Sequence, residues 1–261
     1  MSNLSLAVRD SSTMLRRNLL HARRYPSLTL NLLLTPVMLL LLFVYVFGDT
    51  MSAGIGGGDR SDYVAYLVPG LLLMTIGSTT IGTAVSVSND MTEGIIARFR
   101  TMAIHRGSVL VGHVIGSVVQ SVMSVVLVGA VGVAIGFRSS DATVLEWLAA
   151  FGLVVLFTLA MTWIAVGMGL VSPNAEAASN NALPLIFLPL ISSAFVPVDS
   201  MPGWFQPIAE YQPFTPAIET LRGLLLGTGI GHNGWLALGW CLVLTALGYV
   251  WSTSKFNSDP K

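Results

Sequence analysis

Charged side chains are scarce in this sequence. Asp, Glu, Lys and Arg make up 10% of the 261 residues, whereas hydrophobic residues make up 53%. A soluble domain usually carries about 25% charged residues. The composition therefore excludes an ordinary soluble domain and predicts an integral membrane protein. The formal net charge is zero, so no basic surplus indicates binding to nucleic acid.

Cysteine is also nearly absent, because Cys241 is the only one. One cysteine excludes an internal disulfide framework. No cleavable signal peptide is expected, since the first apolar run is too long for one and is followed by Gly48-Asp49-Thr50 rather than a small-residue cleavage site. The motif G-x-x-x-x-G-K-[ST] does not occur, so the chain is not expected to bind ATP by that motif.

Long apolar runs are what the sequence has in abundance. About 20 apolar residues in a helix cross the hydrocarbon core of a bilayer. Most of the runs reach this length, but one is short and is interrupted by Pro184, Pro189 and Pro197. We predict an all-α membrane domain over 27–252 with six transmembrane helices, at 27–47, 64–88, 109–136, 147–171, 182–198 and 234–252.

Asp, Glu, Lys and Arg are absent from these six segments, and His113 is the only histidine in them. Proton-coupled carriers need such groups as relays, and metal sites and protease centres need ligand or carboxylate pairs, so we expect neither a metal site nor catalytic residues. An ion-coupled secondary transporter with a sodium site of carbonyl and hydroxyl oxygens stays open. An intramembrane hydrolase in which His113 activates Ser117 is a further alternative. The simpler interpretation places His113 at the membrane interface, near the headgroups.

Positive charge is distributed unevenly along the chain. Ten of the 13 Lys and Arg residues lie before the first predicted span, between the second and third, or after the sixth. By the positive-inside rule, both termini and the tail 253–261 are predicted to be cytoplasmic in a multi-pass protein of the cell membrane. Within 1–26 the arginines and most apolar residues fall on opposite helical faces, which predicts an amphipathic interfacial helix.

The segment 91–106, "MTEGIIARFRTMAIHR", is basic and amphipathic. An apolar helical face carries Ile95, Phe99 and Met102, while Glu93 and Arg100 lie on the opposite side. A short helix of this kind docks into a groove on a partner protein, or it rests on lipid headgroups. The pattern alone leaves both interpretations open.

Two motifs resemble those of ABC-2 type permeases, most closely the daunorubicin-resistance branch. The matching positions in the first motif are Gly94, Arg98, Phe99, Arg100, Met102 and Arg106, and Ala103 replaces a frequent proline. In "QPFTPAIETLRGLL" (212–225) the matching positions are Gln212, Pro213, Thr215 and Arg222, and Pro216 replaces a polar or aromatic residue. The resemblance covers nearly the whole chain.

The resemblance implies a half-transporter of the type V exporter kind. Two permease subunits, identical or homologous, would assemble with two separate ATPase subunits that bind ATP and Mg²⁺, while this chain binds no cofactor. The implied fold adds an N-terminal interfacial helix, a cytoplasmic coupling helix and short re-entrant outer helices to the six spans. The implied ATPase contacts are Glu93, Ile95, Arg98, Phe99, Arg100, Met102 and Arg106.

The segment 199–231 is too apolar for a solvated loop and too interrupted for a span. We expect two short helices that re-enter the outer leaflet, one of them with Thr215 as N-cap and Pro216 at its first position. Arg222 is a candidate outer gate residue that pairs with Glu219 or Glu210. Alternatively, Arg222 extends to the headgroups as an anchor.

Small hydroxylated residues follow one another at 77–88, "GSTTIGTAVSVS". Such residues allow helices to approach closely and to hydrogen-bond across their interface. The resemblance implies instead that spans two and five line a substrate path, with Thr79, Thr83, Phe187 and Phe195 as candidates. A path without charge suits a hydrophobic or amphipathic cargo, such as a drug, an antibiotic, a lipid or a glycolipid, exported from the cytoplasm or the inner leaflet.

Overall fold

A computed structural model describes the backbone of residues 26–48, 60–92, 106–139 and 141–258, and the side chains of 34–48, 61–92, 110–139 and 141–258. Every regular element in these ranges is a helix. The five long helices are α2 (Pro26–Tyr45), α4 (Arg60–Thr92), α6 (Arg106–Ala134), α7 (Val144–Val171) and α12 (Asn233–Ser258). The predicted interfacial helix lies outside the described residues, apart from Pro26.

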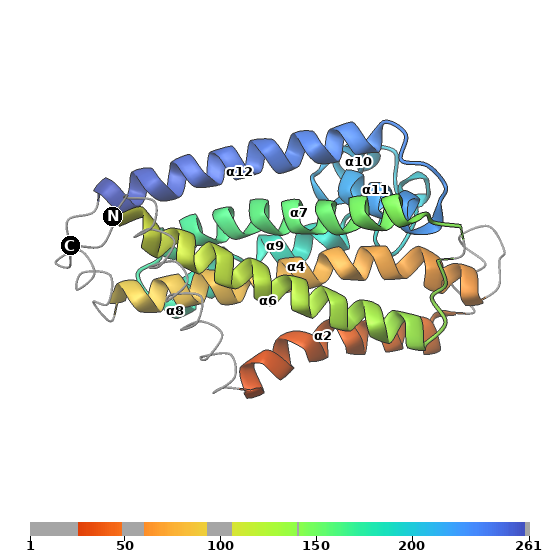
Figure 1. Cartoon of the computed structure of the whole chain (residues 1–261), viewed down its shortest axis with the longest axis horizontal. Helices are drawn as coiled ribbons and strands as arrows, with labels where there is room; N and C mark the ends of the chain where they lie inside the picture. Colours follow the sequence, from red (N-terminus) through yellow and green to blue (C-terminus); the bar gives the residue numbers. More distant parts are fainter. Residues whose placement is uncertain (1–25, 49–59, 93–105, 140, 259–261) are drawn as a thin grey trace.

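The long helices lie side by side, and shorter elements fill one side of the bundle (Figure 1). We call the left end of Figure 1 the α8 end: α4 and α12 end there, and α6 begins there. At the opposite end, called the α11 end, α7 and α12 begin. The short helices are α8 (Ala175–Asn181), α9 (Pro184–Leu190), the 3₁₀ turn η1 (Val198–Ser200), α10 (Gln206–Tyr211) and α11 (Phe214–Leu226).

Four described helices are long and apolar enough to cross a membrane. They comprise Ser61–Thr92, Leu110–Ala134, Val144–Val171 and Asn233–Ser258, and α2 contributes a shorter apolar stretch, Leu34–Tyr45. Helices α4, α7 and α12 extend beyond the predicted spans, and α12 runs into the predicted tail, whereas the apolar part of α6 and most of α2 lie within the predicted bounds. Helix α7 begins before the predicted residue 147 because a capping box fixes its start. The Thr143 hydroxyl accepts from the Glu146 backbone N–H, and the Glu146 carboxylate accepts from the Thr143 backbone N–H.

The predicted fifth span, 182–198, is not one helix. Helix α9 begins at Pro184, a position that accepts proline, and it stops at Leu190, where turns follow. Pro189 inside α9 lacks a backbone N–H and its ring clashes with the preceding turn, which disfavours a longer helix. The broken segment nevertheless runs antiparallel along α4. A Cβ added at Gly77 would lie 2.4 Å from the carbonyl oxygen of Leu185, and one at Gly70 would lie 2.7 Å from that of Ala194.

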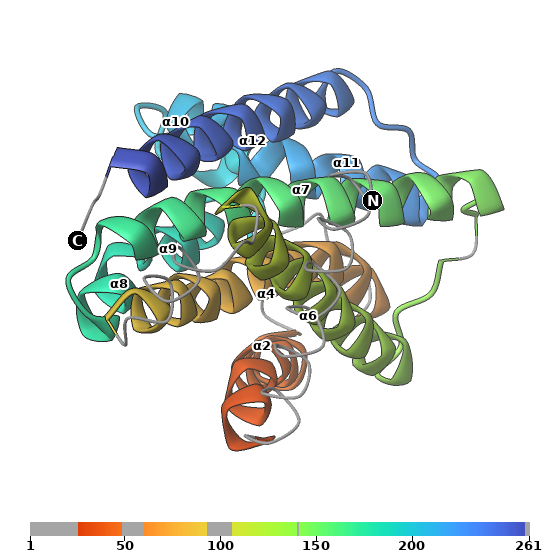
Figure 2. The ribbon, with the colours of Figure 1, turned by 60° about the vertical axis from the view of Figure 1, so that its left-hand side comes forward.

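Helix α4 is the centre of the bundle, as Figure 2 shows. In its most apolar window 83% of the residues are buried, compared with 22% for α12. Tyr63, Leu67 and Leu71 of α4 are fully buried together with Phe157 of α7 and Phe214 of α11, whose rings meet edge to face at 5.0 Å. The short helices therefore form part of the main core.

A second, smaller apolar cluster lies toward the α8 end. It combines Val87 of α4, Leu110 and Val114 of α6, Trp163 and Val166 of α7, and Phe256 of α12. Glycines bring α7 and α12 into close approach beside it, since a Cβ at Gly167 would lie 2.4 Å from the indole of Trp251. Four helices are thus packed together at this end.

Candidate functional site

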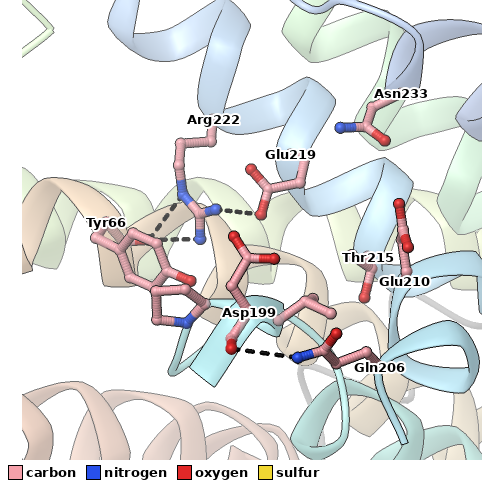
Figure 3. Close-up of a pocket in the computed structure, with 10 residues that line it drawn as sticks. Tyr66, Asp199, Gln206, Glu210, Thr215, Glu219, Arg222 and Asn233 are labelled. Atoms are coloured by element: carbon pink, nitrogen blue, oxygen red, sulfur yellow. Dashed lines mark hydrogen bonds and ion pairs between the residues drawn. The ribbon is translucent and has the colours of Figure 1, made fainter. Parts of the chain in front are cut away.

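Arg222 occupies a buried position on α11, with only 8% of the residue exposed. Its Nη1 donates to the Glu219 carboxylate at 2.5 Å. Its Nη2 donates to the carbonyl oxygens of Tyr66 and Ser193, each at 3.0 Å. The guanidinium carbon also lies 3.7 Å from the centroid of the Tyr66 ring, a cation–π contact (Figure 3).

These contacts join three segments of the chain. Tyr66 belongs to α4, Ser193 follows α9, and Glu219 and Arg222 are one turn apart on α11. The hydroxyl of Tyr66 also donates to the carbonyl of Ser193 at 2.9 Å. The interpretation of Arg222 as a headgroup anchor is therefore wrong, because the side chain is directed into the protein. Of the two acids proposed as its partner, Glu219 is the one that it contacts.

The residues before Arg222 hold α11 in place. The Gln212 amide donates to the Leu188 carbonyl at 3.3 Å, and its oxygen accepts from the Phe214 backbone N–H at 3.2 Å. The buried Thr215 hydroxyl donates to the Ala209 carbonyl. The expectation that Thr215 is an N-cap is wrong, because α11 already begins at Phe214. Thr215 instead ties the first turn of α11 to α10.

A cavity of about 400 Å³ opens beside Arg222. Glu219 and Glu210 line it, together with Asp199 and Gln206, which the sequence analysis did not single out. Figure 3 draws these carboxylates around one space. The carboxylates of Glu210, Glu219 and Asp199 come from α10, α11 and η1, and among the described residues of the lining Arg222 is the one cationic side chain. The cavity is therefore polar and acidic.

His113 lies at the other end of the bundle, near the start of α6. It is 4% exposed, and its Nε2 lies 2.9 Å from Oδ2 of Asp90, a residue that is 8% exposed. The imidazole is therefore buried between α4 and α6, and its depth relative to the headgroups stays a prediction. No hydrogen bond to Ser117 is found in the described part of the chain, so the structure lends the hydrolase interpretation no support.

The chain was compared with known protein families. The model of the ABC-2 type transporter family matches residues 10–226, which include the Arg222 site and the Asp90–His113 pair. The chain belongs to the ABC-2 type transporter family. As a subunit of a membrane transporter with several apolar helices, this ABC-2 protein is located in a membrane.

Named relatives of this ABC-2 protein agree with the match. It is 28% identical, over 85% of its length and 77% of the relative's, to the daunorubicin resistance ABC transporter permease protein DrrB1 of Streptomyces coeruleorubidus. It is 25% identical, over 68% of its length and 67% of the relative's, to the probable doxorubicin resistance ABC transporter permease protein DrrC of Mycobacterium tuberculosis. Nodulation protein J of Rhizobium meliloti is 23% identical, over 74% of each chain.

The predicted ATPase-coupling residues of this ABC-2 protein lie mostly outside the described residues. This applies to Glu93, Ile95, Arg98, Phe99, Arg100 and Met102, and Arg106 is described only as the first backbone position of α6. Within the predicted coupling helix, Met91 and Thr92 belong to α4. The segment thus joins the last turn of α4 to the first turn of α6.

The predicted substrate-path residues have different surroundings. Thr79 and Thr83 are buried in α4, and the Thr79 hydroxyl lies 2.7 Å from that of Ser121 on α6. Phe195 is buried against Phe43 of α2, with ring centroids 4.6 Å apart. Phe187 is 56% exposed on α9. The Thr79 contact is the kind of cross-helix hydrogen bond that packs membrane helices.

We expect Thr79→Ala and Ser121→Ala to have equal and small effects. A cross-helix hydrogen bond in a membrane protein contributes about 0.6 kcal/mol on average, and the double variant should cost no more than either single change. The thermal midpoint of the purified protein in detergent measures the effect. A change in cargo affinity confined to Thr79→Ala would instead assign Thr79 to the substrate path.

Proposed function

We propose that this ABC-2 protein is the permease subunit of an ATP-powered exporter. It would move a hydrophobic or amphipathic compound out of the cytoplasm or the inner leaflet. The observation that carries the proposal is the family match over residues 10–226, supported by relatives whose names state resistance to daunorubicin and doxorubicin. A drug-like cargo is the chemical class that these names favour.

The energy for transport would come from a separate ATPase that binds ATP and Mg²⁺. The helix over 93–104 would dock in a groove of that ATPase, with Ile95 and Phe99 as apolar anchors and Arg98 and Arg100 paired with carboxylates. The fold supports this role, since the segment joins the ends of α4 and α6 at one end of the bundle. A movement imposed there would act on both helices.

A second permease copy and membrane lipids would cover the outside of the bundle. Only 22% of the apolar window of α12 and 33% of that of α6 is buried inside the chain. The charge distribution along the sequence supports a cytoplasmic α8 end and cytoplasmic termini. The α11 end would then face outward, with Glu210, Glu219 and Arg222 at an outer gate and Thr79, Thr83, Phe187 and Phe195 along the path.

Reconstitution tests the proposal. The chain is purified with the ATPase with which it assembles and is placed in liposomes, and uptake of fluorescent daunorubicin is followed. We expect uptake with Mg-ATP and none with the chain alone under a proton or sodium gradient. Uptake by the chain alone under such a gradient would identify a secondary transporter and reject the proposal.

Phe99→Ala is expected to weaken binding of the ATPase strongly. Removing a central aromatic anchor from an interface costs about 2 kcal/mol or more, which is roughly a thirtyfold loss of affinity. The Arg98→Glu/Arg100→Glu double variant should act in the same direction. Co-purification and permease-stimulated ATP hydrolysis measure the loss. Phe151→Ala, at a 53% exposed position on α7, is the matched control; equal losses in both variants would contradict docking through Phe99.

A further inference from the structure

The two helix ends that flank the coupling segment are joined by a buried polar contact. Asp90 lies in the last turn of α4 and His113 lies two turns into α6. Nε2 of His113 and Oδ2 of Asp90 are 2.9 Å apart, and both residues are more than nine-tenths buried. The segment that would contact the ATPase therefore leaves and re-enters the bundle beside this pair.

Apolar packing surrounds the Asp90–His113 pair. Leu110 lies one helical turn before His113, and Val114 directly follows it; both belong to the smaller apolar cluster, as does Val87 of α4. Next to the cluster, α4 and α7 approach so closely that a Cβ at Gly169 would lie 2.5 Å from the Ala84 carbonyl oxygen. The ends of α4 and α6 are thus held in a block that also contains parts of α7 and α12.

Stability alone does not explain a buried acid and imidazole at this position. Replacing both partners of a buried hydrogen bond by apolar side chains of the same shape can be nearly neutral or stabilising, so burial of such a pair is weak evidence for a contribution to folding. A short polar contact has a different property: its limits on distance and angle specify one relative position of the two helices, and fixing register is the best-attested role of buried polar groups. The pair is therefore suited to keep two moving helix ends in register.

We propose that Asp90 and His113 are positioning residues that make the ends of α4 and α6 move as one unit when the ATPase moves the coupling segment. The proposal rests on the proposed function. Without the pair, the segment would displace one helix end relative to the other, and less of the movement would reach the α11 end.

The test measures movement at the far end and does not require the cargo to be known. The single cysteine, Cys241, is buried and is replaced by alanine. Asp199→Cys then introduces an exposed thiol beside the outer cavity. The rate at which a membrane-impermeant maleimide labels this thiol is measured in the complex with the ATPase, with and without Mg-ATP and vanadate.

With the Asp90–His113 pair intact, we expect nucleotide to change the labelling rate. In His113→Ala and in Asp90→Asn the nucleotide-dependent change in labelling rate should be smaller by roughly twofold to thirtyfold. Residues between two coupled sites alter the coupling over this range. The rate without nucleotide should stay the same, because the outer cavity itself is unaltered. Two further variants should recover part of the nucleotide-dependent change in labelling rate. They are His113→Gln, whose amide can still donate to Asp90, and the exchanged pair Asp90→His/His113→Asp.

Ser252→Ala is the matched control, since its buried hydroxyl also makes a cross-helix hydrogen bond toward the same end, at 3.1 Å to the Trp163 carbonyl. It should leave the nucleotide-dependent change intact. An unchanged response in His113→Ala, or an equal loss in Ser252→Ala, overturns the proposal. If His113→Ala does not assemble with the ATPase, the labelling rates of His113→Gln and of the exchanged pair are used instead. A nucleotide-dependent change in them as large as that of the parent protein would also overturn the proposal, whereas a partial change supports it. Absence of any nucleotide response with the pair intact would instead contradict the proposed function.

Discussion

Arg222→Ala is expected to destabilise the protein severely. The substitution removes the N–H donors that Arg222 supplies to the carbonyl oxygens of Tyr66 and Ser193, and it leaves the Glu219 carboxylate without its cation. The Ser193 oxygen keeps the hydroxyl of Tyr66 as a side-chain donor. A hydrogen bond from a charged donor contributes about 1.5–3 kcal/mol, and Arg222 makes such bonds to two backbone carbonyls. A typical domain is stable by about 5–15 kcal/mol, so this loss removes a large part of the total.

Arg222→Lys should recover only part of this stability. An ammonium group carries the charge, but it lacks the planar fork that reaches the Tyr66 carbonyl, the Ser193 carbonyl and Glu219 together. The thermal midpoint in detergent and the yield of monodisperse protein measure both variants. Arg138→Ala is the control, because Arg138 is exposed and hydrogen-bonds to the carbonyl of Val133 at 2.8 Å. Equal midpoints for Arg222→Ala and Arg138→Ala would contradict the structural role of Arg222.

Gly77→Ala should also destabilise the protein, although alanine is the better helix former. The added methyl carbon would lie 2.4 Å from the Leu185 carbonyl oxygen, a backbone atom that cannot rotate away. Either α4 or the broken segment must shift, and overpacking of this kind costs about 1–3 kcal/mol or more. The cost should exceed the gain in helix propensity, which is about 0.5–1 kcal/mol.

The same substitution on α7 provides the control. A Cβ at Gly152 would meet nothing within 4 Å, so Gly152→Ala should leave stability unchanged or raise it slightly. The thermal midpoint should therefore fall in Gly77→Ala and stay the same or rise in Gly152→Ala. If Gly77→Ala were as stable as the parent protein, α4 and the segment after α8 would not be in the close contact described here.

Much of the fold follows from local pattern. The apolar runs around 64–88, 109–136, 147–171 and 234–252 lie in long helices, because a helix satisfies its own backbone in a membrane. Helix ends were less predictable: α7 begins at Val144 because of the Thr143–Glu146 capping box, although the apolar run suggested a later start. The T-x-x-E spacing would have been sufficient to predict this.

The polar contacts were predictable only where both partners are neighbours in sequence. Arg222 and Glu219 are one helical turn apart, so their pairing was a natural expectation. Asp90 was missed as a partner of His113, because it lies beyond the end of the predicted second span. Nothing in the sequence near Thr79 indicates Ser121, although hydroxylated residues in a membrane helix indicate that some partner exists.

By itself, the sequence determined that this chain is helical, crosses a membrane and carries the motifs of a transporter subunit, because composition, periodicity and motif spacing are properties of neighbouring residues. The tertiary structure decided which buried polar groups meet. The carbonyls that hold Arg222 belong to residues 156 and 29 positions away, and the broken segment follows α4 because Gly70 and Gly77 leave room for it. Such contacts depend on how the helices pack, and the periodicity of a single helix does not contain that information.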